Sequence, residues 1–355
     1  MVKVEPGDII IECYPIVHKI NLKEKMRRCN YCFIESSSLR KCSACKFIWY
    51  CSVDCQANDW KYIHRAECKF RPIGADPSVD YHDMEMNFRF FRLVSKFPEK
   101  LLDKIKIFDG HISFEQAINR KDLEEGPYSP CHDKIPEILD GLRERRIFLD
   151  RDTFHKAGRI IPRTRCNIRD HNLNFIGSGI YIPTSYYNYG CDSNCCFTFD
   201  GIKMQLRATR AFNTELQEPI LAHIDPEILD GPRPIYLSNF RPCSRCTPDR
   251  ENKRLLMDLS KHFNEALSTG DNSGALTKGL ELLECERNIS PSPNPYRTIL
   301  LKKLVELSIK LEDDWCIALE KDLRDNFLIT HGREHFFYKE VEKLSYLTTI
   351  FIMEA

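Results

Sequence analysis

The stretch from residue 29 to residue 68 contains CNYC at 29–32, CSAC at 42–45, CSVDC at 51–55 and HRAEC at 64–68. A tetrahedral zinc ion takes four sulfur or nitrogen ligands, and gaps of two or three residues let both members of a pair face one ion. Four such pairs therefore predict two zinc ions. The eight predicted ligands are Cys29, Cys32, Cys42, Cys45, Cys51, Cys55, His64 and Cys68. Spacing alone leaves open which pairs share an ion.

The composition of the whole chain favours a metal over disulfides. The chain has 355 residues and 17 cysteines, an odd number, and seven of them lie between Cys29 and Cys68, which fits metal binding in a reducing compartment. The 52 basic and 52 acidic residues cancel, so no overall field draws the molecule to nucleic acid or to a membrane. The sequence contains neither a membrane-length apolar run nor a signal-peptide pattern. We therefore expect an intracellular protein, in the nucleus, the cytoplasm or both.

The pattern of apolar residues changes along the chain. Three isoleucines at 9–11 predict a strand, and residues 80–147 carry apolar residues at helical spacing and predict a helical linker. Short apolar runs separated by glycines over 154–210 predict small strands and tight turns. Four prolines make 231–248 irregular. From residue 252 the helical spacing returns, and we expect helical hairpins stacked as in tetratricopeptide repeats.

The cysteine-rich stretch resembles the MYND zinc finger at every ligand position. The match extends to WYCS at 49–52 and to Gln56 and Trp60 on the helix before the histidine ligand. The resemblance implies an interleaved arrangement of the ligands. One zinc would be held by Cys29, Cys32, Cys51 and Cys55, and the other by Cys42, Cys45, His64 and Cys68. A peptide-docking module and a purely structural zinc knot are both open for such a finger, and both are commoner than a nucleic-acid binder.

A second motif lies in residues 188–194, which read NYGCDSN between GSGIY at 177–181 and MQLRA at 204–208. It resembles the core of the SET methyltransferase domain, where Asn-His-Ser-Cys-x-Pro-Asn contacts S-adenosylmethionine. Asn188, Cys191 and Asn194 match that segment, whereas a tyrosine replaces its histidine at 189 and a serine its proline at 193. The resemblance implies that Asn188 and Tyr189 would lie at the cofactor.

A SET domain split by a MYND finger and followed by helices is the layout of the SET and MYND domain (SMYD) family of protein-lysine methyltransferases. This chain resembles the family over nearly its whole length, including ITHGREH at 329–335. The implied fold is α+β, with small SET-type sheets and a helical C-terminal domain like tetratricopeptide repeats. The implied domains are a first SET piece at 1–25, the finger at 26–70, a helical insert at 71–152, the SET core at 153–228, a post-SET-like segment at 229–250 and the helical domain at 251–355.

Two departures from the family affect the methyl-transfer site. The family's Gly-x-Gly element, whose backbone approaches the cofactor closely, would precede Val4, and the sequence begins at Met1. We therefore expect one wall of the cofactor pocket to be missing. His223 stands in place of the tyrosine whose hydroxyl would orient the lysine amine. A surface or core histidine without a catalytic role is the simpler interpretation of His223.

A third departure concerns a post-SET zinc. The resemblance implies that Cys191 would share this ion with Cys243 and Cys246, and a structural zinc needs four ligands. Cys195, Cys196 or a water could supply the fourth. The alternative is that the three cysteines are small buried hydrophobic residues, so a third zinc ion stays open.

Two functions remain open. As a degenerate SET protein, the chain would be a scaffold that binds protein or peptide partners through its finger and its helical domain. As an enzyme, it would use S-adenosylmethionine to methylate a lysine of a histone or another protein, with Asn188 and Tyr189 at the cofactor and His223 near the reacting amine. Two losses in one pocket favour the scaffold.

Overall fold

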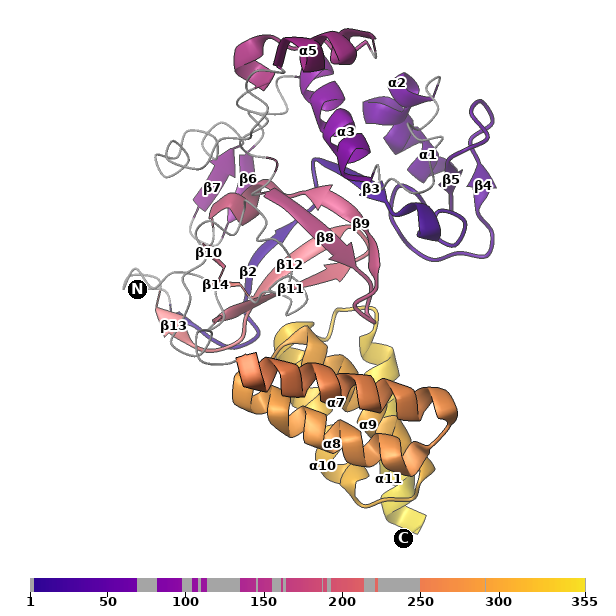
Figure 1. Cartoon of the computed structure of the whole chain (residues 1–355), viewed down its shortest axis with the longest axis vertical. Helices are drawn as coiled ribbons and strands as arrows, with labels where there is room; N and C mark the ends of the chain where they lie inside the picture. The colour runs from indigo at the N-terminus through magenta and orange to yellow at the C-terminus, as the bar shows by residue number, and fades with distance from the viewer. Residues whose placement is uncertain are drawn as a thin grey trace.

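The computed structural model places the finger and two linker helices above small β-sheets, with a bundle of helices below (Figure 1). The structure describes residues 3–68, 82–97, 104–107, 110–113, 135–144, 146–154, 161, 164–186, 188–189, 193–213, 221–222, 250–290 and 292–354.

The central part contains two small sheets. The five-stranded sheet has the order β10 (Asn188–Tyr189), β14 (Leu221–Ala222), β11 (Cys195–Asp200), β12 (Lys203–Ala208), β2 (Ile9–Cys13). The three-stranded sheet has the order β3 (Val17–Ile20), β9 (Phe175–Ile180), β8 (Arg165–Arg169). A short antiparallel pair joins β1 (Lys3–Val4) to β13 (Phe212–Asn213), and a 3₁₀ turn, η6 (Ile182–Tyr186), follows β9. The strands predicted at 9–11 and over 154–210 are thus present.

Both faces of strand β12 are buried. Met204, Leu206 and Ala208 alternate along it and are fully buried in the apolar core, as the period of two along a strand requires. Gln205 and Arg207 lie between them and are also buried. Arg207 donates from Nη1 to the carbonyl oxygen of Gly7 at 2.9 Å. The polar face of β12 is therefore buried as well, because the helical bundle covers it.

The finger, at the right of Figure 1, is built from short elements. They are η1 (Leu22–Glu24), β4 (Arg40–Lys41), β5 (Trp49–Tyr50), α1 (Val53–Asp59), a π-helical turn η2 (Trp60–His64) and α2 (Arg65–Glu67). Ser52 caps α1, because its hydroxyl accepts a hydrogen bond from the backbone N–H of Cys55 at 3.1 Å.

The linker region contains α3 (His82–Lys96) and α5 (Ile135–Glu144), as the helical spacing predicts. The prediction is wrong between them, where β6 (Lys104–Ile107) and β7 (Gly110–Ser113) form an antiparallel hairpin. The sequence KIKI at 104–107 alternates polar and apolar residues, which is the strand period, and Asp-Gly at 109–110 favours a tight turn. The proline after Phe97 disfavours a continued helix.

Five helices form the C-terminal bundle. They are α7 (Arg250–Thr269), α8 (Asn272–Ile289), α9 (Pro295–Lys310), α10 (Trp315–Thr330) and α11 (Tyr338–Glu354), and each packs against the next (Figure 1). Their apolar residues form a core separate from that of the sheets. The predicted α+β fold with a helical C-terminal region is confirmed. The domain boundaries given above remain predictions.

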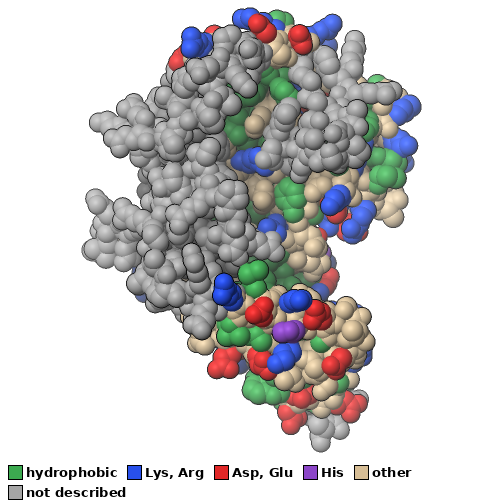
Figure 2. All heavy atoms as spheres, viewed as in Figure 1, with side chains coloured by type: hydrophobic (Ala, Val, Ile, Leu, Met, Phe, Trp, Pro, Cys, Tyr) green, Lys and Arg blue, Asp and Glu red, His purple; other side chains and the backbone are tan. Residues whose placement is uncertain are grey.

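The turn between α10 and α11 connects the bundle to the sheets. His335 lies within hydrogen-bond distance of the carbonyl oxygen of Phe199, at 3.3 Å from Nε2. The ring of Phe337 stacks on His171, with centroids 4.6 Å apart. Arg207 forms an ion pair with Glu334. On the face shown in Figure 2, acidic and basic side chains of the bundle are interspersed.

Candidate metal centre

The eight predicted zinc ligands gather as two groups of four. One group consists of Cys29, Cys32, Cys51 and Cys55, and the other of Cys42, Cys45, His64 and Cys68. Within each group, all ligand atoms lie within 4.8 Å of one another. We call them the first and the second zinc site.

The distances within each group fit a zinc ion. Sulfur ligands at about 2.3 Å from a tetrahedral ion lie about 3.8 Å from one another, and a sulfur and an imidazole nitrogen lie about 3.5 Å apart. In the first site, the sulfur of Cys51 is 3.6 Å from those of Cys32 and Cys55. In the second site, Nε2 of His64 lies 3.4 Å from the sulfur of Cys42. The donor sets, three or four thiolates with at most one imidazole, are those of structural zinc sites.

Each Cys-x-x-Cys pair is shaped by the same backbone turn. The amide of Phe33 donates to the carbonyl of Cys29 at 2.9 Å, and the amide of Lys46 donates to that of Cys42 at 3.0 Å. Phe33 and Lys46 both adopt a positive φ, 64° and 58°. This conformation costs a residue with a Cβ about 1 kcal/mol or more, so the surrounding contacts, with the metal, must compensate for it. The turn aims both sulfurs of a pair at one point.

The helical part of the finger supplies the remaining ligands. The cap of α1 fixes Cys55, and the following turns bring His64 into the finger's interior, where it is 2% exposed. The rings of Tyr50 and Trp60 contact His64 edge-on, with centroids 6.1 and 5.7 Å away. They restrict the orientation of the imidazole, which a metal ligand requires.

The SET-like strands bring two of the predicted methyl-transfer segments together. Strand β10, which is Asn188–Tyr189, runs parallel to β14, and Tyr189 is paired with Ala222. Ala222 also pairs with Cys195 at the start of β11. Ala222 directly precedes the predicted catalytic position in the sequence. The backbone thus places the predicted cofactor segment beside the end of β14.

The remaining predicted site residues lie outside the described part of the chain. They are His223 and the proposed third-zinc ligands Cys191, Cys243 and Cys246. Cys195 and Cys196, considered as a fourth ligand, are fully buried on β11. Burial raises the pKa of the Cys196 thiol to about 12.

Comparison with known proteins supports the finger and the SET-like core together. The model of the MYND finger matches residues 29–68. N-lysine methyltransferase SMYD2 of Homo sapiens is 25% identical over 226 residues, which are 62% of this chain and 49% of that protein. SMYD2-A of Danio rerio is 23% identical over 227 residues, with the same two shares. The chain spans about half the length of the curated relatives it matches. These matches support a SET and MYND domain-containing, SMYD-like family. The resemblance described from the sequence is thus confirmed.

The SMYD-like chain is a methyltransferase-like zinc-binding protein, and its finger has two zinc sites. Among the described helices, none is long and apolar enough to cross a membrane.

The finger of this SMYD-like chain is tied to α3 by buried charges, which the sequence motifs do not reveal. Arg89 of α3 donates to Asp59 of the finger at 2.8 Å, and Asp59 also accepts from the hydroxyl of Tyr50 at 2.7 Å. Arg92 donates to Glu67 at 3.1 Å. Both arginines are buried. The sequence signal is an arginine pair three positions apart within the otherwise apolar run FRFFRLV at 88–94.

Proposed function

We propose that this SMYD-like protein is a scaffold that binds protein partners, with the SET-like sheet as its platform and without methyl transfer. One observation carries the proposal: His223, the residue after β14, stands where the related sequence motif has a tyrosine. A tyrosine hydroxyl can orient a lysine amine by one hydrogen bond while staying neutral near pH 7. An imidazole differs in shape, reach and charge, and small misplacements at a reacting centre are costly.

The cofactor side of the motif departs as well. Tyr189 replaces a histidine in the strand that pairs with β14. Tyr189 lies on β10, and His223 directly follows the paired strand β14 in the sequence. If both positions serve the methyl-transfer site, the cofactor and the amine would each lose a partner. This supports the scaffold, although it leaves Asn188 in place.

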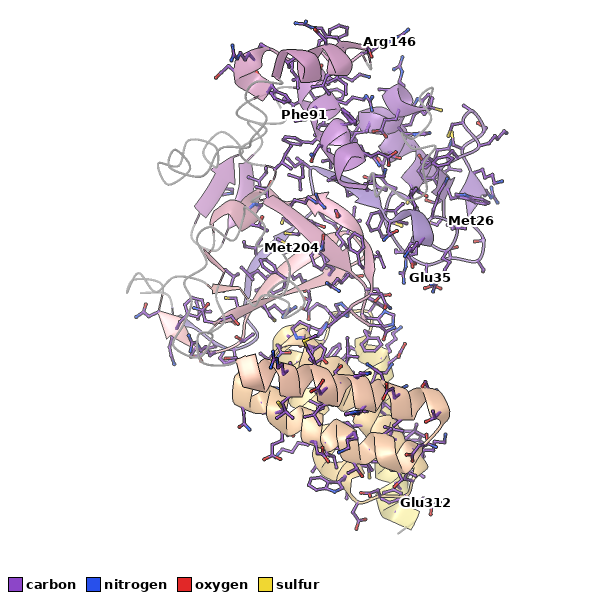
Figure 3. The ribbon with its side chains drawn as sticks, in the orientation of Figure 1. Met26, Glu35, Phe91, Arg146, Met204 and Glu312 are labelled. Carbon is purple, nitrogen blue, oxygen red and sulfur yellow. The ribbon has the colours of Figure 1, made fainter. Side chains whose placement is uncertain are left out.

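The finger has the exposed apolar side chains that a peptide-docking module needs. Met26 (Figure 3) and Val53 are both 72% exposed, and Ile34 is 57% exposed. Phe47 is also exposed and lies beneath the ammonium group of Lys25. We propose that such side chains receive a short peptide of a partner protein, and that the helical bundle offers a second surface.

The alternative function is an active protein-lysine N-methyltransferase. It is favoured by the related proteins, which are named N-lysine methyltransferases. In that case the chain would bind S-adenosylmethionine, and a neutral lysine of a histone or another protein would attack the methyl group. Neutrality of the lysine requires a desolvated channel that lowers its pKa.

One pair of measurements separates the two functions. Calorimetric titration of the zinc-loaded protein with S-adenosylmethionine should give no dissociation constant in the low micromolar range, which would correspond to about −8 kcal/mol. Incubation with labelled cofactor and a histone mixture should give no methylation, and His223→Tyr should leave that result unchanged. Methylation by the wild-type chain that His223→Ala abolishes would establish the enzyme instead.

A further inference from the structure

The first zinc site is attached to the SET-like sheets by its own backbone. Phe33 directly follows the ligand Cys32, yet its ring is fully buried in the apolar core of the sheets and not in that of the finger. It packs against Gly177 of β9, where an added Cβ would lie 2.5 Å from Cε2 of Phe33. The ring thus occupies the space that a side chain at 177 would need.

The ligand Cys32 itself touches the turn between β11 and β12. Its carbonyl oxygen lies so close to Gly201 that a Cβ on this glycine would be 2.5 Å from it. Gly201 also has a φ of +58°, which glycine adopts without strain. Since the partner atom belongs to the backbone, a larger residue at 201 could fit only if the Cys32 peptide moved.

A buried arginine completes this attachment. Arg28, which precedes the ligand Cys29, donates to the carbonyl oxygen of Phe33 at 3.3 Å and to Asp170 at 3.0 Å. Asp170 lies in the turn between β8 and β9. The side chains of Arg28 and Asp170 are 9% and 7% exposed. Residues 28–33, which we call the first knuckle, therefore contact both sheets.

The second zinc site is attached elsewhere. Glu67, the residue before the ligand Cys68, pairs with Arg92 at 3.1 Å and lies 3.5 Å from Arg89. Both arginines belong to α3. The two sites are thus joined to different neighbours, the first to the sheets and the second to the linker helix.

We propose that occupancy of the first zinc site is energetically coupled to the β11–β12 hairpin of the SET-like core. Zinc would bind the sulfur of Cys32, and the carbonyl oxygen of the same residue lies against Gly201. The conformation of the first knuckle that binds zinc is therefore also the conformation that packs against the turn of the β11–β12 hairpin. Such coupling is reciprocal, so zinc stabilises the hairpin and an intact hairpin retains zinc.

Through strand pairing, the coupling would extend to β14 and β10, the strands beside the predicted methyl-transfer site. β11 pairs with β14 at Cys195 and Ala222, and β14 pairs with β10 at Tyr189. Loss of the first zinc would loosen a sheet that includes these strands. The inference concerns zinc and stability, so it stands whether the chain transfers methyl groups or acts as a scaffold.

Amide hydrogen exchange of the full zinc-loaded chain tests the proposal in one direction. Cys32→Ser removes a ligand of the first site, and Cys45→Ser is its matched control in the second. Cys32→Ser should lower the protection of residues 195–208, whereas Cys45→Ser should lower it in 82–96 and leave the hairpin as in the wild type. Wild-type protection of 195–208 in Cys32→Ser, or equal loss there in both variants, would overturn the coupling.

Zinc release tests the reverse direction without removing a ligand. Gly201→Ala introduces the Cβ that meets the Cys32 carbonyl. Gly270→Ala is the control, since Gly270 has a φ of +77° and nothing within 4 Å of its added Cβ. With a chromogenic chelator, Gly201→Ala should release one of two zinc ions at about tenfold lower chelator concentration, about 1.4 kcal/mol. Gly270→Ala should match the wild type. Wild-type release of both ions from Gly201→Ala would refute the proposal.

Discussion

At the scale of single residues, His18 shows how the junction of finger and sheets constrains chemistry. It lies on β3, is 8% exposed, and contacts the rings of Tyr31 and Phe33 edge-on. Its Nε2 has no hydrogen-bond partner within the described residues. Burial, reinforced by the positive charge of Arg89, lowers the pKa of His18 to about 4. The folded protein therefore holds this histidine neutral.

This pKa predicts a loss of stability in mild acid. In the unfolded chain this histidine has a pKa of about 6.5. Between that value and the lower pKa of the folded state, the unfolded chain binds a proton and the folded chain does not, which favours unfolding. From about pH 7.5 to pH 5, His18 alone should lower the free energy of unfolding by about 2 kcal/mol. Urea unfolding of zinc-loaded protein at both pH values should show a smaller decrease for His18→Phe. The exposed His262→Phe serves as control, and an unchanged decrease in His18→Phe would contradict the assignment.

Buried ion pairs also act at this scale. Arg89→Met would remove the buried cation that pairs with Asp59 at 2.8 Å, while Glu67 would keep Arg92. Breaking a buried pair by removing one partner costs about 3 kcal/mol or more. The control is Arg143→Met on α5, where the pair with Asp140 is exposed and is worth about 0–1 kcal/mol. We expect chemical denaturation to show a large decrease in stability only for Arg89→Met. Equal effects of the two substitutions would count against the buried network.

At the scale of elements, α8 is fixed by close approach to α7 and α9. An added Cβ at Gly279 would lie 2.4 Å from Leu304 of α9 and 2.8 Å from Phe263 of α7. The core of the bundle has no free space beside Gly279. An alanine at this position would therefore improve helix propensity but worsen the packing.

A matched pair of substitutions decides which effect dominates. Alanine is favoured over glycine within a helix by about 1 kcal/mol. Gly141→Ala on α5, with nothing within 4 Å of its Cβ, should therefore raise the melting temperature. Gly279→Ala should lower it, because overpacking costs about 1–3 kcal/mol. Stabilisation by Gly279→Ala would show that α8 can move away from its neighbours.

At the scale of the whole molecule, the finger depends on its metals. The buried apolar residues of its own core are only Cys29, Cys42 and Tyr50 among the described residues, too few for independent stability. Zinc binding is then part of its folding free energy.

Metal analysis of the purified chain should therefore give at least two zinc ions per molecule. A value near three would indicate a further site at Cys191, Cys243 and Cys246. Removal of zinc by a strong chelator should abolish the cooperative thermal transition of the finger. A content near one ion or less, or an unchanged transition after chelation, would contradict a zinc-dependent fold.

Features that depend on neighbours along the chain could be predicted from the pattern of amino acids. Cys-x-x-Cys spacing identified the eight ligands, and helical periodicity located α7 to α11, since both are local geometry. The helical prediction is wrong at β6 and β7, because a period of two over only four residues, KIKI at 104–107, does not stand out from the helical spacing around it. Which ligand pairs share an ion followed from the resemblance, because spacing places no constraint on it.

Contacts between distant segments could not be predicted in this way and are seen in the folded chain. Nothing near Phe33 in the sequence indicates that its ring leaves the finger for the core of the sheets. The sequence also gives no sign that Arg28 pairs with Asp170, 142 positions away. The same holds for the close contact between the Cys32 carbonyl oxygen and Gly201. Such contacts depend on how the finger docks on the sheets, because the ring and the charges gain their burial only when both surfaces meet. The sequence therefore predicted the zinc ligands, whereas the contacts that link the zinc sites to the sheets depend on how the finger packs against them.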